Sequence, residues 1–250
     1  MWGTVITVDV RQPVDGELLD RVIAWFHLVD QRFSTWRADS EIRRLGRGEL
    51  RLGDVSADVR EVLALCDRIR ADTWGAYEVI VAADPRVTWQ EGFAPIDPSG
   101  MVKGWALDRA GALLRDAGVH NFAINAGGDV LVAGSSGDGS AWRVGIQHPE
   151  VRDGVMGTVA ATDAGVATSG LYERGAHIVD PRRGERATAL TAATVVAPSL
   201  AVADGYATAL VALGEDASRW MSDHPEVAAA IVDGHGCVSV TEAFARMRII

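Results

Sequence analysis

The chain has 250 residues, of which 48% are hydrophobic and 23% charged, and its formal net charge is −10. This is the composition of an ordinary globular protein, long enough for one large domain or two small ones. The longest basic cluster is Arg182, Arg183 and Arg186, which is too small for a nucleic-acid groove, because phosphate neutralisation supplies most of the affinity of nucleic-acid-binding proteins.

The first half of the chain alternates between strand and helix patterns. Residues 2–10 alternate apolar and polar side chains and predict a strand. Apolar side chains at helical spacing predict helices over 15–33 and 56–71, the second with Ser56 as N-cap, and a helical turn over 39–45. The pattern weakens into strand and loop over 77–98. A helix is then predicted over 103–117, closed by Gly118.

The second half is richer in strands. Residues 121–126 and 130–133 predict two strands around Gly127 and Gly128, and 134–140 reads as a turn. A helix is predicted over 204–213, and a short strand after Ala243. Further strands are predicted at 142–147, 157–162, 165–169, 176–180, 192–196, 227–232 and 237–241. Because no regular βαβ repeat appears, we expect an α+β fold with largely antiparallel sheets and packed helices, in a single compact unit spanning residues 1–250.

The N-terminus and the apolar runs bear on location. No signal peptide or lipobox is visible, and no apolar run approaches the roughly 18–20 residues of a membrane span. We therefore expect a cytoplasmic protein without a membrane-spanning segment.

Three stretches carry polar side chains that point to chemistry. Around 96–118, Gly100 and Gly104 permit a close backbone approach near Lys103, although a tight turn with a solvated lysine explains the same residues. Around 124–134, an asparagine and an aspartate flank a Gly-Gly pair, which equally describes a hairpin turn. Around 167–185, polar groups surround His177, which alone would read as a hydrogen-bonded core histidine.

The stretch AVADGYATALVALG at 201–214 has two interpretations. Asp204 at the start of the predicted helix suits an N-cap, since its side chain would accept from a free backbone N–H. Alternatively, residues four apart share a helix face, so Asp204 and Thr208 would offer a carboxylate and a hydroxyl to one hard cation. Oxygen ligands of this kind suit Mg²⁺, which commonly bridges one or two protein groups to substrate phosphates.

Taken together in order, several stretches resemble the motifs of the ApbE family, the FAD:protein FMN transferases, over nearly the whole chain. They are WGT at 2–4, FSTWRADSEIRRL at 33–45, TWGAYE at 73–78, DPSGMVKGWALD at 97–108, NAGGD at 125–129, TSGLYER and HIVDPRRG within 168–184, and ADGYATALVALG at 203–214.

The resemblance implies a T-fold-like α+β architecture that binds FAD and Mg²⁺. It further implies transfer of FMN from FAD to a Thr or Ser hydroxyl of an acceptor protein carrying a flavinylation motif, with release of AMP. Two alternatives share the fold: an FAD pyrophosphatase that releases FMN and AMP, and a flavin-binding protein without turnover.

The same resemblance assigns residues to roles. Asp204 and Thr208 match the family's metal ligands, with the backbone carbonyl of Gly100 as a third, and Asp204 thereby enters the catalytic set with His177, a candidate proton acceptor. The positions that match FAD-lining residues are Trp2, Trp36, Gly75, Ala76, Tyr77, Asp97, Lys103 and Val179.

The chain also departs from the family pattern. Trp2 stands for Met, Trp74 and Glu78 stand for two Asp residues, and Arg183 stands for Thr and adds positive charge near the expected site. Ala207 lacks the oxygen that some relatives carry beside the metal-binding threonine.

Overall fold

A computed structural model describes residues 4–79, 95–151, 154–171 and 178–249. The helices are α1 (Gly16–Phe33), α2 (Glu41–Gly46), α3 (Ala57–Asp72), α4 (Ser99–Asp116), α6 (Leu200–Leu213), the 3-10 turn η1 (Gly214–Asp216), α7 (Ala217–Asp223) and α8 (Glu242–Met247). The strands are β1 (Ile6–Val10), β2 (Phe122–Ala126), β3 (Asp129–Ala133), β4 (Trp142–Gln147), β5 (Val155–Ala161), β6 (Ala164–Gly170), β7 (Val179–Asp180), β8 (Glu185–Arg186), β9 (Leu190–Ala197), β10 (Ala228–Asp233), β11 (Val238–Val240) and β12 (Arg248–Ile249).

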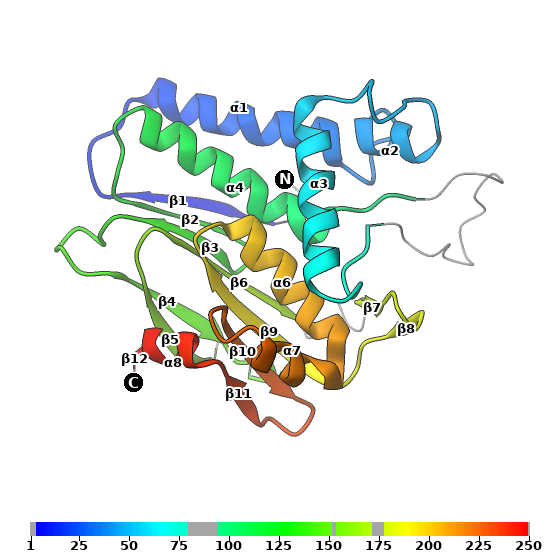
Figure 1. The fold of residues 1–250 in the computed structure, drawn as a ribbon. Helices are drawn as coiled ribbons and strands as arrows, with labels where there is room; N and C mark the ends of the chain where they lie inside the picture. The colour runs from blue at the N-terminus through cyan, green and yellow to red at the C-terminus, as the bar shows by residue number, and fades with distance from the viewer. Residues whose placement is uncertain (1–3, 80–94, 152–153, 172–177, 250) are drawn as a thin grey trace.

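A seven-stranded sheet forms the middle of the molecule, in the order β1-β2-β3-β6-β9-β10-β11 (Figure 1). Every neighbouring pair in it is antiparallel. Side chains alternate between the two faces of each strand, so register decides which face a residue joins. Phe122, Ile124 and Leu131 join the core under the helices, whereas Val130, Val132 and Val166 face the other way.

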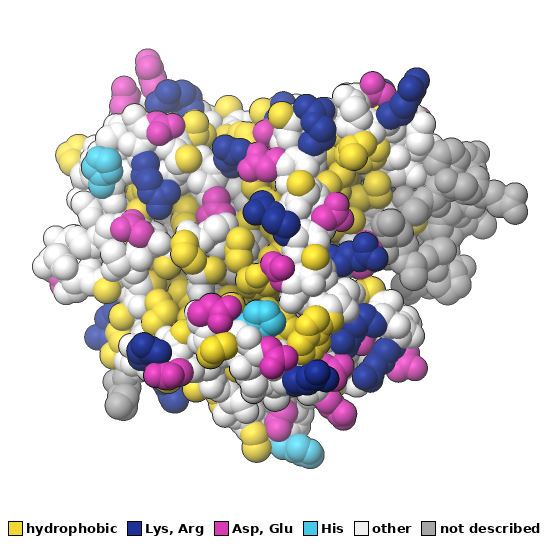
Figure 2. Space-filling model, in the orientation of Figure 1, with side chains coloured by type: hydrophobic (Ala, Val, Ile, Leu, Met, Phe, Trp, Pro, Cys, Tyr) yellow, Lys and Arg dark blue, Asp and Glu magenta, His cyan; other side chains and the backbone are white. Residues whose placement is uncertain are grey.

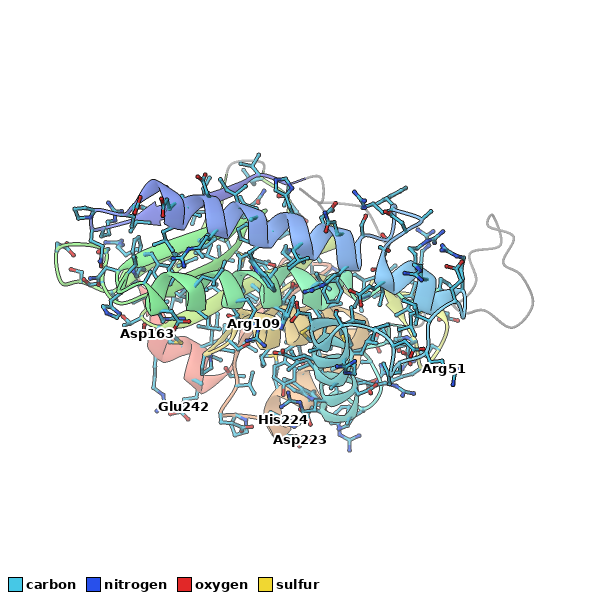
Figure 3. All side chains as sticks on the ribbon, turned by 90° about the horizontal axis from the view of Figure 1, so that it is seen from above. Arg51, Arg109, Asp163, Asp223, His224 and Glu242 are labelled. Carbon is cyan, nitrogen blue, oxygen red and sulfur yellow. The ribbon has the colours of Figure 1, made fainter. Side chains whose placement is uncertain are left out.

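Helices cover one face of this sheet. Helices α4 and α6 lie directly on the strands, and α1 and α3 pack against their outer sides (Figure 1). Seen from above, α1 and α4 run side by side along the sheet (Figure 3). The core under the helices includes Leu107 of α4 and Leu210 of α6, both fully buried. A carboxylate or hydroxyl on this face of α4 or α6 is therefore surrounded by apolar side chains.

A three-stranded antiparallel sheet, β12-β5-β4, covers part of the opposite face (Figure 1). A second apolar core lies between the two sheets and includes Trp142, Val144 and Val159. Helix α8 adds Phe244 to it, with Thr241 as its N-cap accepting from the Phe244 backbone N–H. The small two-stranded ribbon of β7 and β8 lies apart from both sheets.

The structure confirms the expected α+β class with largely antiparallel sheets, but two helices begin earlier than predicted. Helix α4 begins at Ser99 rather than at residue 103, because the Asp97 carboxylate accepts from the Ser99 backbone N–H and offsets the poor helix propensity of Gly100 and Gly104. Helix α6 begins at Leu200 rather than at 204, with Ser199 as its N-cap. The N-cap interpretation of Asp204 is therefore wrong.

Helices α7 and α8 are absent from the predictions. The segment after Ala243 was expected to be a strand, but helix α8 continues to Met247 and only Arg248 and Ile249 pair with β5. Both helices are short, and tertiary contacts rather than propensity stabilise such helices. Trp220 of α7, for example, is fully buried and donates its indole N–H to the Asp72 carbonyl at 2.8 Å.

On the helical face of the surface, acidic and basic side chains are interspersed among apolar ones (Figure 2). Within the described part of the chain, none of the helices combines the length and the apolar character required to traverse a bilayer.

Candidate functional site

The start of α6 is wedged between α4 and β6, and two glycines make this possible. A Cβ atom at Gly104 of α4 would lie 2.5 Å from the carbonyl oxygen of Leu200, and one at Gly165 of β6 would collide with the Leu200 backbone. Without side chains at these positions the backbones approach closely. Asp204 and Thr208, one and two turns further along α6, are thereby brought against the first turns of α4.

Asp204 is a buried carboxylate with few partners. Its side chain is 4% exposed, and its one hydrogen bond within the described residues, from the Gly104 backbone N–H, is long at 3.4 Å. Burial raises the pKa of Asp204 to about 8; Lys103 lowers it, and the Asp129 carboxylate raises it further. Desolvation of the charged form is the dominant cause. Such a group is stabilised in its ionised form by a nearby cation.

Thr208 lies next to Asp204 on the same face of α6, beside Gly100 and Tyr77. A Cβ atom at Gly100 would lie 3.3 Å from Thr208 Oγ1 and 3.4 Å from Tyr77 Oη, so the glycine leaves open a space between these oxygens. Burial raises the pKa of Tyr77 well above its usual value, which keeps the phenol neutral. Ser169 Oγ of β6 lies 3.0 Å from Thr208 Oγ1 on the far side.

A partly buried ion pair lies close to Asp204 and acts on its pKa. Lys103 Nζ lies 2.6 Å from Asp129 Oδ2, and the lysine side chain is 29% exposed whereas the aspartate is almost fully buried. The other oxygen of Asp129 accepts from the Thr168 backbone N–H at 3.0 Å. Burial raises the pKa of Asp129 and the adjacent Lys103 lowers it. Lys103 is thus held at a fixed place with part of its length open to solvent.

The oxygen atoms at this place fit a magnesium ion. A structural zinc site takes four ligands, chiefly Cys and His, and no group of three or more His, Cys, Asp and Glu side chains gathers among the described residues. Mg²⁺ instead takes one or two carboxylates with water and substrate oxygens. Asp204 supplies a buried, under-coordinated carboxylate, Thr208 a hydroxyl, and the space beside Gly100 would be filled by any side chain.

The residues predicted to line FAD are only partly brought together. Gly75, Ala76 and Tyr77 form the turn after α3, where Gly75 has a φ of +80° and the two following side chains are buried. Tyr77 Oη lies 3.4 Å from the Cβ position of Gly100, which belongs to the first turn of α4. Asp97 lies just before that turn and accepts from the Ser99 backbone N–H. Through Gly100, the turn after α3 and its predicted FAD-lining residues lie close to Thr208.

Two other residues predicted to line FAD are exposed to solvent. Trp36 follows α1 and is 96% exposed, and Val179 of β7 is 43% exposed. No contact described in the structure connects either side chain to Asp204. Trp2 and His177 lie outside the described residues.

The arginines of the 180–184 turn are already paired. Arg182 forms a two-pronged ion pair with Asp180, donating from Nε at 2.9 Å and from a terminal nitrogen at 2.8 Å. Arg183 Nε lies 3.7 Å from Asp180 Oδ2, and a terminal nitrogen of Arg183 lies 3.7 Å from Asp216 Oδ2. The positive charge expected from Arg183 is therefore matched by carboxylates. Arg182 also approaches the turn after α3, with its Cγ 3.9 Å from the Cβ position of Gly75.

Asp129 and Ser169 belong to the motifs NAGGD and TSGLYER, but neither is among the site residues predicted from the sequence. Both lie on the helical face of the sheet, because they alternate with Val130 and Thr168, which face the other way. Asp108 was also missed: its carboxylate accepts from Ser199 Oγ and from the backbone N–H of Leu200 and Ala201. The strand alternation could have placed Asp129 and Ser169 on one face, but only the sheet order makes them neighbours.

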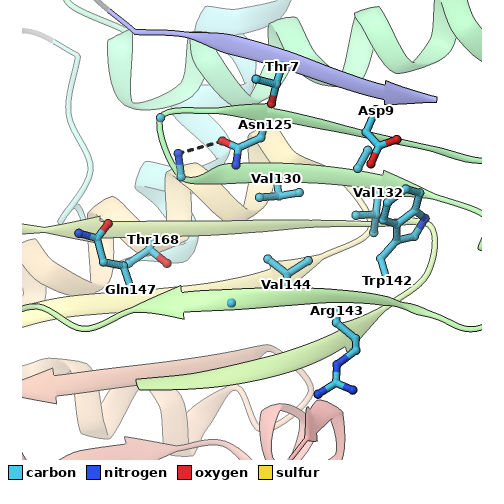
Figure 4. Close-up of a pocket in the computed structure, with 14 residues that line it drawn as sticks. Thr7, Asp9, Asn125, Val130, Val132, Trp142, Arg143, Val144, Gln147 and Thr168 are labelled. Carbon is cyan, nitrogen blue, oxygen red and sulfur yellow. Dashed lines mark hydrogen bonds between the residues drawn. The ribbon is translucent and has the colours of Figure 1, made fainter. Parts of the chain in front are cut away.

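A cavity of about 380 Å³ opens on the other face of the sheet, between β1–β3 and β4 (Figure 4). Thr7, Asp9 and Asn125 line one side of it, and Val144 and Gln147 line the other. Asn125 accepts from the Gly128 backbone N–H at 3.1 Å and so stabilises the Gly-Gly turn. Since Asp204 and Thr208 lie on the helical face, this cavity is separate from the site described above.

Comparison with known proteins relates the chain to one family. The family model described as the ApbE family matches residues 2–95 and 81–232. A curated relative, the FAD:protein FMN transferase of Klebsiella pneumoniae (strain 342), is 28% identical over 271 residues, covering 86% of this chain and 76% of the relative.

Two solved structures share the fold. The apo form of the Pseudomonas stutzeri flavinyl transferase ApbE superposes with a TM-score of 0.83 at 24% identity, covering 100% of this chain and 95% of that one. The flavin transferase ApbE from Vibrio cholerae superposes with a TM-score of 0.81 at 23% identity, covering 98% and 96%.

Proposed function

Because the chain belongs to the ApbE family, we propose that it is a Mg²⁺-dependent FAD:protein FMN transferase. In this proposal FMN moves from FAD to a Thr or Ser hydroxyl of an acceptor protein, and AMP is released. The observation that carries it is the pair formed by the buried Asp204 and the half-buried Thr208, of which Thr208 lies beside Gly100 and Asp204 lies close to the Lys103–Asp129 ion pair. A flavin carrier without turnover has no evident need for these groups.

The proposed reaction replaces the phosphoanhydride bond of the FAD pyrophosphate by a phosphate ester bond to the acceptor. The hydroxyl oxygen of the acceptor forms a bond to the phosphorus on the FMN side of the pyrophosphate, and the bond from that phosphorus to the bridging oxygen breaks. AMP leaves with the bridging oxygen, and the hydroxyl proton passes to a base. His177 is our candidate for this base, because an unperturbed imidazole titrates near neutral pH.

The described residues would share the work of binding and orientation. Asp204, Thr208 and the Gly100 main chain would hold Mg²⁺, which when bound neutralises charge on the pyrophosphate. Lys103, kept in place by Asp129, would lie near a phosphate oxygen. The remaining residues proposed to contact FAD are Trp2, Trp36, Gly75, Ala76, Tyr77, Asp97 and Val179.

The test supplies the protein with FAD and Mg²⁺, with and without a carrier protein bearing a Ser/Thr flavinylation motif. AMP is followed by chromatography and covalent flavin by fluorescence on a denaturing gel. We expect AMP release and a fluorescent acceptor, both abolished in Asp204→Ala. Glu242→Ala, which removes an exposed carboxylate on α8, serves as the control and should behave as wild type.

Other outcomes identify other functions. Free FMN and AMP formed without an acceptor would indicate an FAD pyrophosphatase, and intact FAD after long incubation would indicate a flavin-binding protein. Unchanged AMP release by Asp204→Ala would overturn the assignment of the metal site.

A further inference from the structure

Two hydroxyl groups meet between the sheet and α6. Ser169 Oγ of β6 lies 3.0 Å from Thr208 Oγ1, within hydrogen-bonding distance. Ser169 pairs with Ala193 of β9 in the ladder between two interior strands, so its backbone is fixed by the sheet. The neighbouring residue Thr168 faces the other way and makes an equivalent hydroxyl pair, with Thr194 Oγ1 at 2.9 Å.

The hydroxyl of a helical threonine has an alternative partner. In a helix interior a Thr Oγ–H commonly donates to a main-chain carbonyl of the preceding turn. For Thr208 that group belongs to the turn containing Asp204. A hydroxyl has one proton and two lone pairs, and only a lone pair binds a cation. The direction of the proton therefore decides whether Thr208 is a good metal ligand.

The structure assigns to Ser169 the role of a positioning residue for Thr208, an inference that rests on the proposed metal site. The 3.0 Å contact allows either hydroxyl to donate; in this role Ser169 Oγ, on β6, accepts the Thr208 proton. The lone pairs of Thr208 are then left to face Gly100 of α4, and Asp204 lies one turn earlier on the same face of α6. A bound cation would repel the proton and so favour the same direction. Ser169 would not itself be a ligand of the cation.

The expected loss of metal affinity follows from what is known of other metal sites. Residues that orient a metal ligand through a hydrogen bond typically change metal affinity by 10–100-fold when they are replaced. Thr208 is an uncharged ligand that shares the ion with Asp204, so we expect a value near the lower end. Ser169→Ala should weaken binding about 10-fold.

The test uses Mn²⁺ alone as the probe, with free Mn²⁺ measured by electron paramagnetic resonance during titration of the full chain. Ser169→Ala should lose about 10-fold in affinity, whereas Ser169→Thr, which retains a hydroxyl, should restore binding to near the wild-type value. Thr194→Val is the matched control, because it removes the equivalent hydroxyl pair on the opposite face of the sheet. It should bind Mn²⁺ as wild type does.

A double-mutant cycle tests whether Ser169 acts through Thr208. Thr208→Val alone should weaken Mn²⁺ binding, and adding Ser169→Ala to it should cause no further loss. If the effects of the two substitutions add, Ser169 does not act through Thr208 and the inference is wrong. Should Ser169→Ala not fold, as judged by circular dichroism, Ser169→Cys replaces it in the cycle, because a thiol is only a weak acceptor.

Failure of this inference differs from failure of the proposed function. If wild type binds Mn²⁺ and Asp204→Ala does not, yet Ser169→Ala matches wild type, only the role of Ser169 is overturned. If wild type and Asp204→Ala bind Mn²⁺ equally, the metal site is wrong and the role of Ser169 is overturned with it.

Discussion

At the scale of single residues, Asp204 shows how surroundings change the chemistry of a carboxylate. An exposed aspartate titrates near pH 4, whereas burial raises the pKa of Asp204 to about 8. The folded protein without metal therefore retains a proton that the unfolded chain has lost. Between these two pKa values the unfolded state binds fewer protons, so this group lowers the stability of the folded state as pH rises. Above about pH 8 its cost is constant.

We predict that Asp204→Asn abolishes this pH dependence. In the absence of metal, wild type should lose more stability than the variant between pH 6 and pH 8, measured as the free energy of unfolding in urea. With Mg²⁺ present, wild type should regain stability at pH 8, because the metal requires the ionised carboxylate, and the variant should not. Thr208→Val retains the Asp204 carboxylate. In the absence of metal, its free energy of unfolding should therefore depend on pH as that of wild type does. Equal losses in wild type and Asp204→Asn would contradict this account.

At the scale of elements, the N-terminus of α6 is capped by another helix. The Asp108 carboxylate of α4 accepts from Ser199 Oγ at 2.7 Å and from the backbone N–H groups of Leu200 and Ala201 at 2.9 and 3.0 Å. These are among the donors that a helix leaves unpaired in its first turn. Asp108 also lies one turn beyond Gly104, the point of closest approach between the helices. It therefore fixes where α6 begins and how the face that carries Asp204 and Thr208 is turned.

We predict that Asp108→Ala lowers the free energy of unfolding by about 2–3 kcal/mol, because the variant loses an N-terminal cap and leaves buried donors without partners. Mn²⁺ affinity should fall as well, since α6 carries both Asp204 and Thr208. The control is Asp15→Ala, which removes the N-cap of α1, where the aspartate accepts from the Glu17 N–H at 3.1 Å. It should cost about 1 kcal/mol and leave Mn²⁺ binding unchanged. Normal Mn²⁺ binding by Asp108→Ala would show that the cap does not orient α6.

At the scale of the whole molecule, the helical layer and the sheet meet at the proposed site. Asp204 and Thr208 come from α6, Gly100 and Lys103 from α4, and Asp129 from β3. A ligand that binds these residues together binds the folded state only, and it stabilises that state by mass action. The inter-sheet cavity on the other face contributes none of these groups.

We predict that FAD and Mg²⁺ together raise the melting temperature more than the sum of either alone. FAD at about 100 times its Kd gives about 2.7 kcal/mol, which corresponds to a shift on the order of 5–10 °C for a chain of this size. Melting is followed by circular dichroism. Riboflavin, which lacks the pyrophosphate, should show no Mg²⁺-dependent shift beyond that caused by Mg²⁺ alone. An equal shift with FAD in the presence of EDTA would contradict a metal at the pyrophosphate.

Secondary structure was predictable from the sequence wherever the periodicity is strong, because strands and amphipathic helices are encoded locally. The pattern of 15–33 predicted α1 nearly to the residue, and the absence of a βαβ repeat predicted the antiparallel sheets. The order and spacing of the motifs also determined the family, which required no coordinates.

The start of α6, the burial of Asp204 and the neighbours of Thr208 depend on tertiary contacts. The helix begins at Leu200 because Asp108, distant in sequence, caps it, so Asp204 faces the core instead of capping a helix end. Ser169 meets Thr208 only because β6 lies beneath α6. Local propensity cannot encode these contacts, since each depends on which long-range partner is brought to the same place by packing of the sheet and helices.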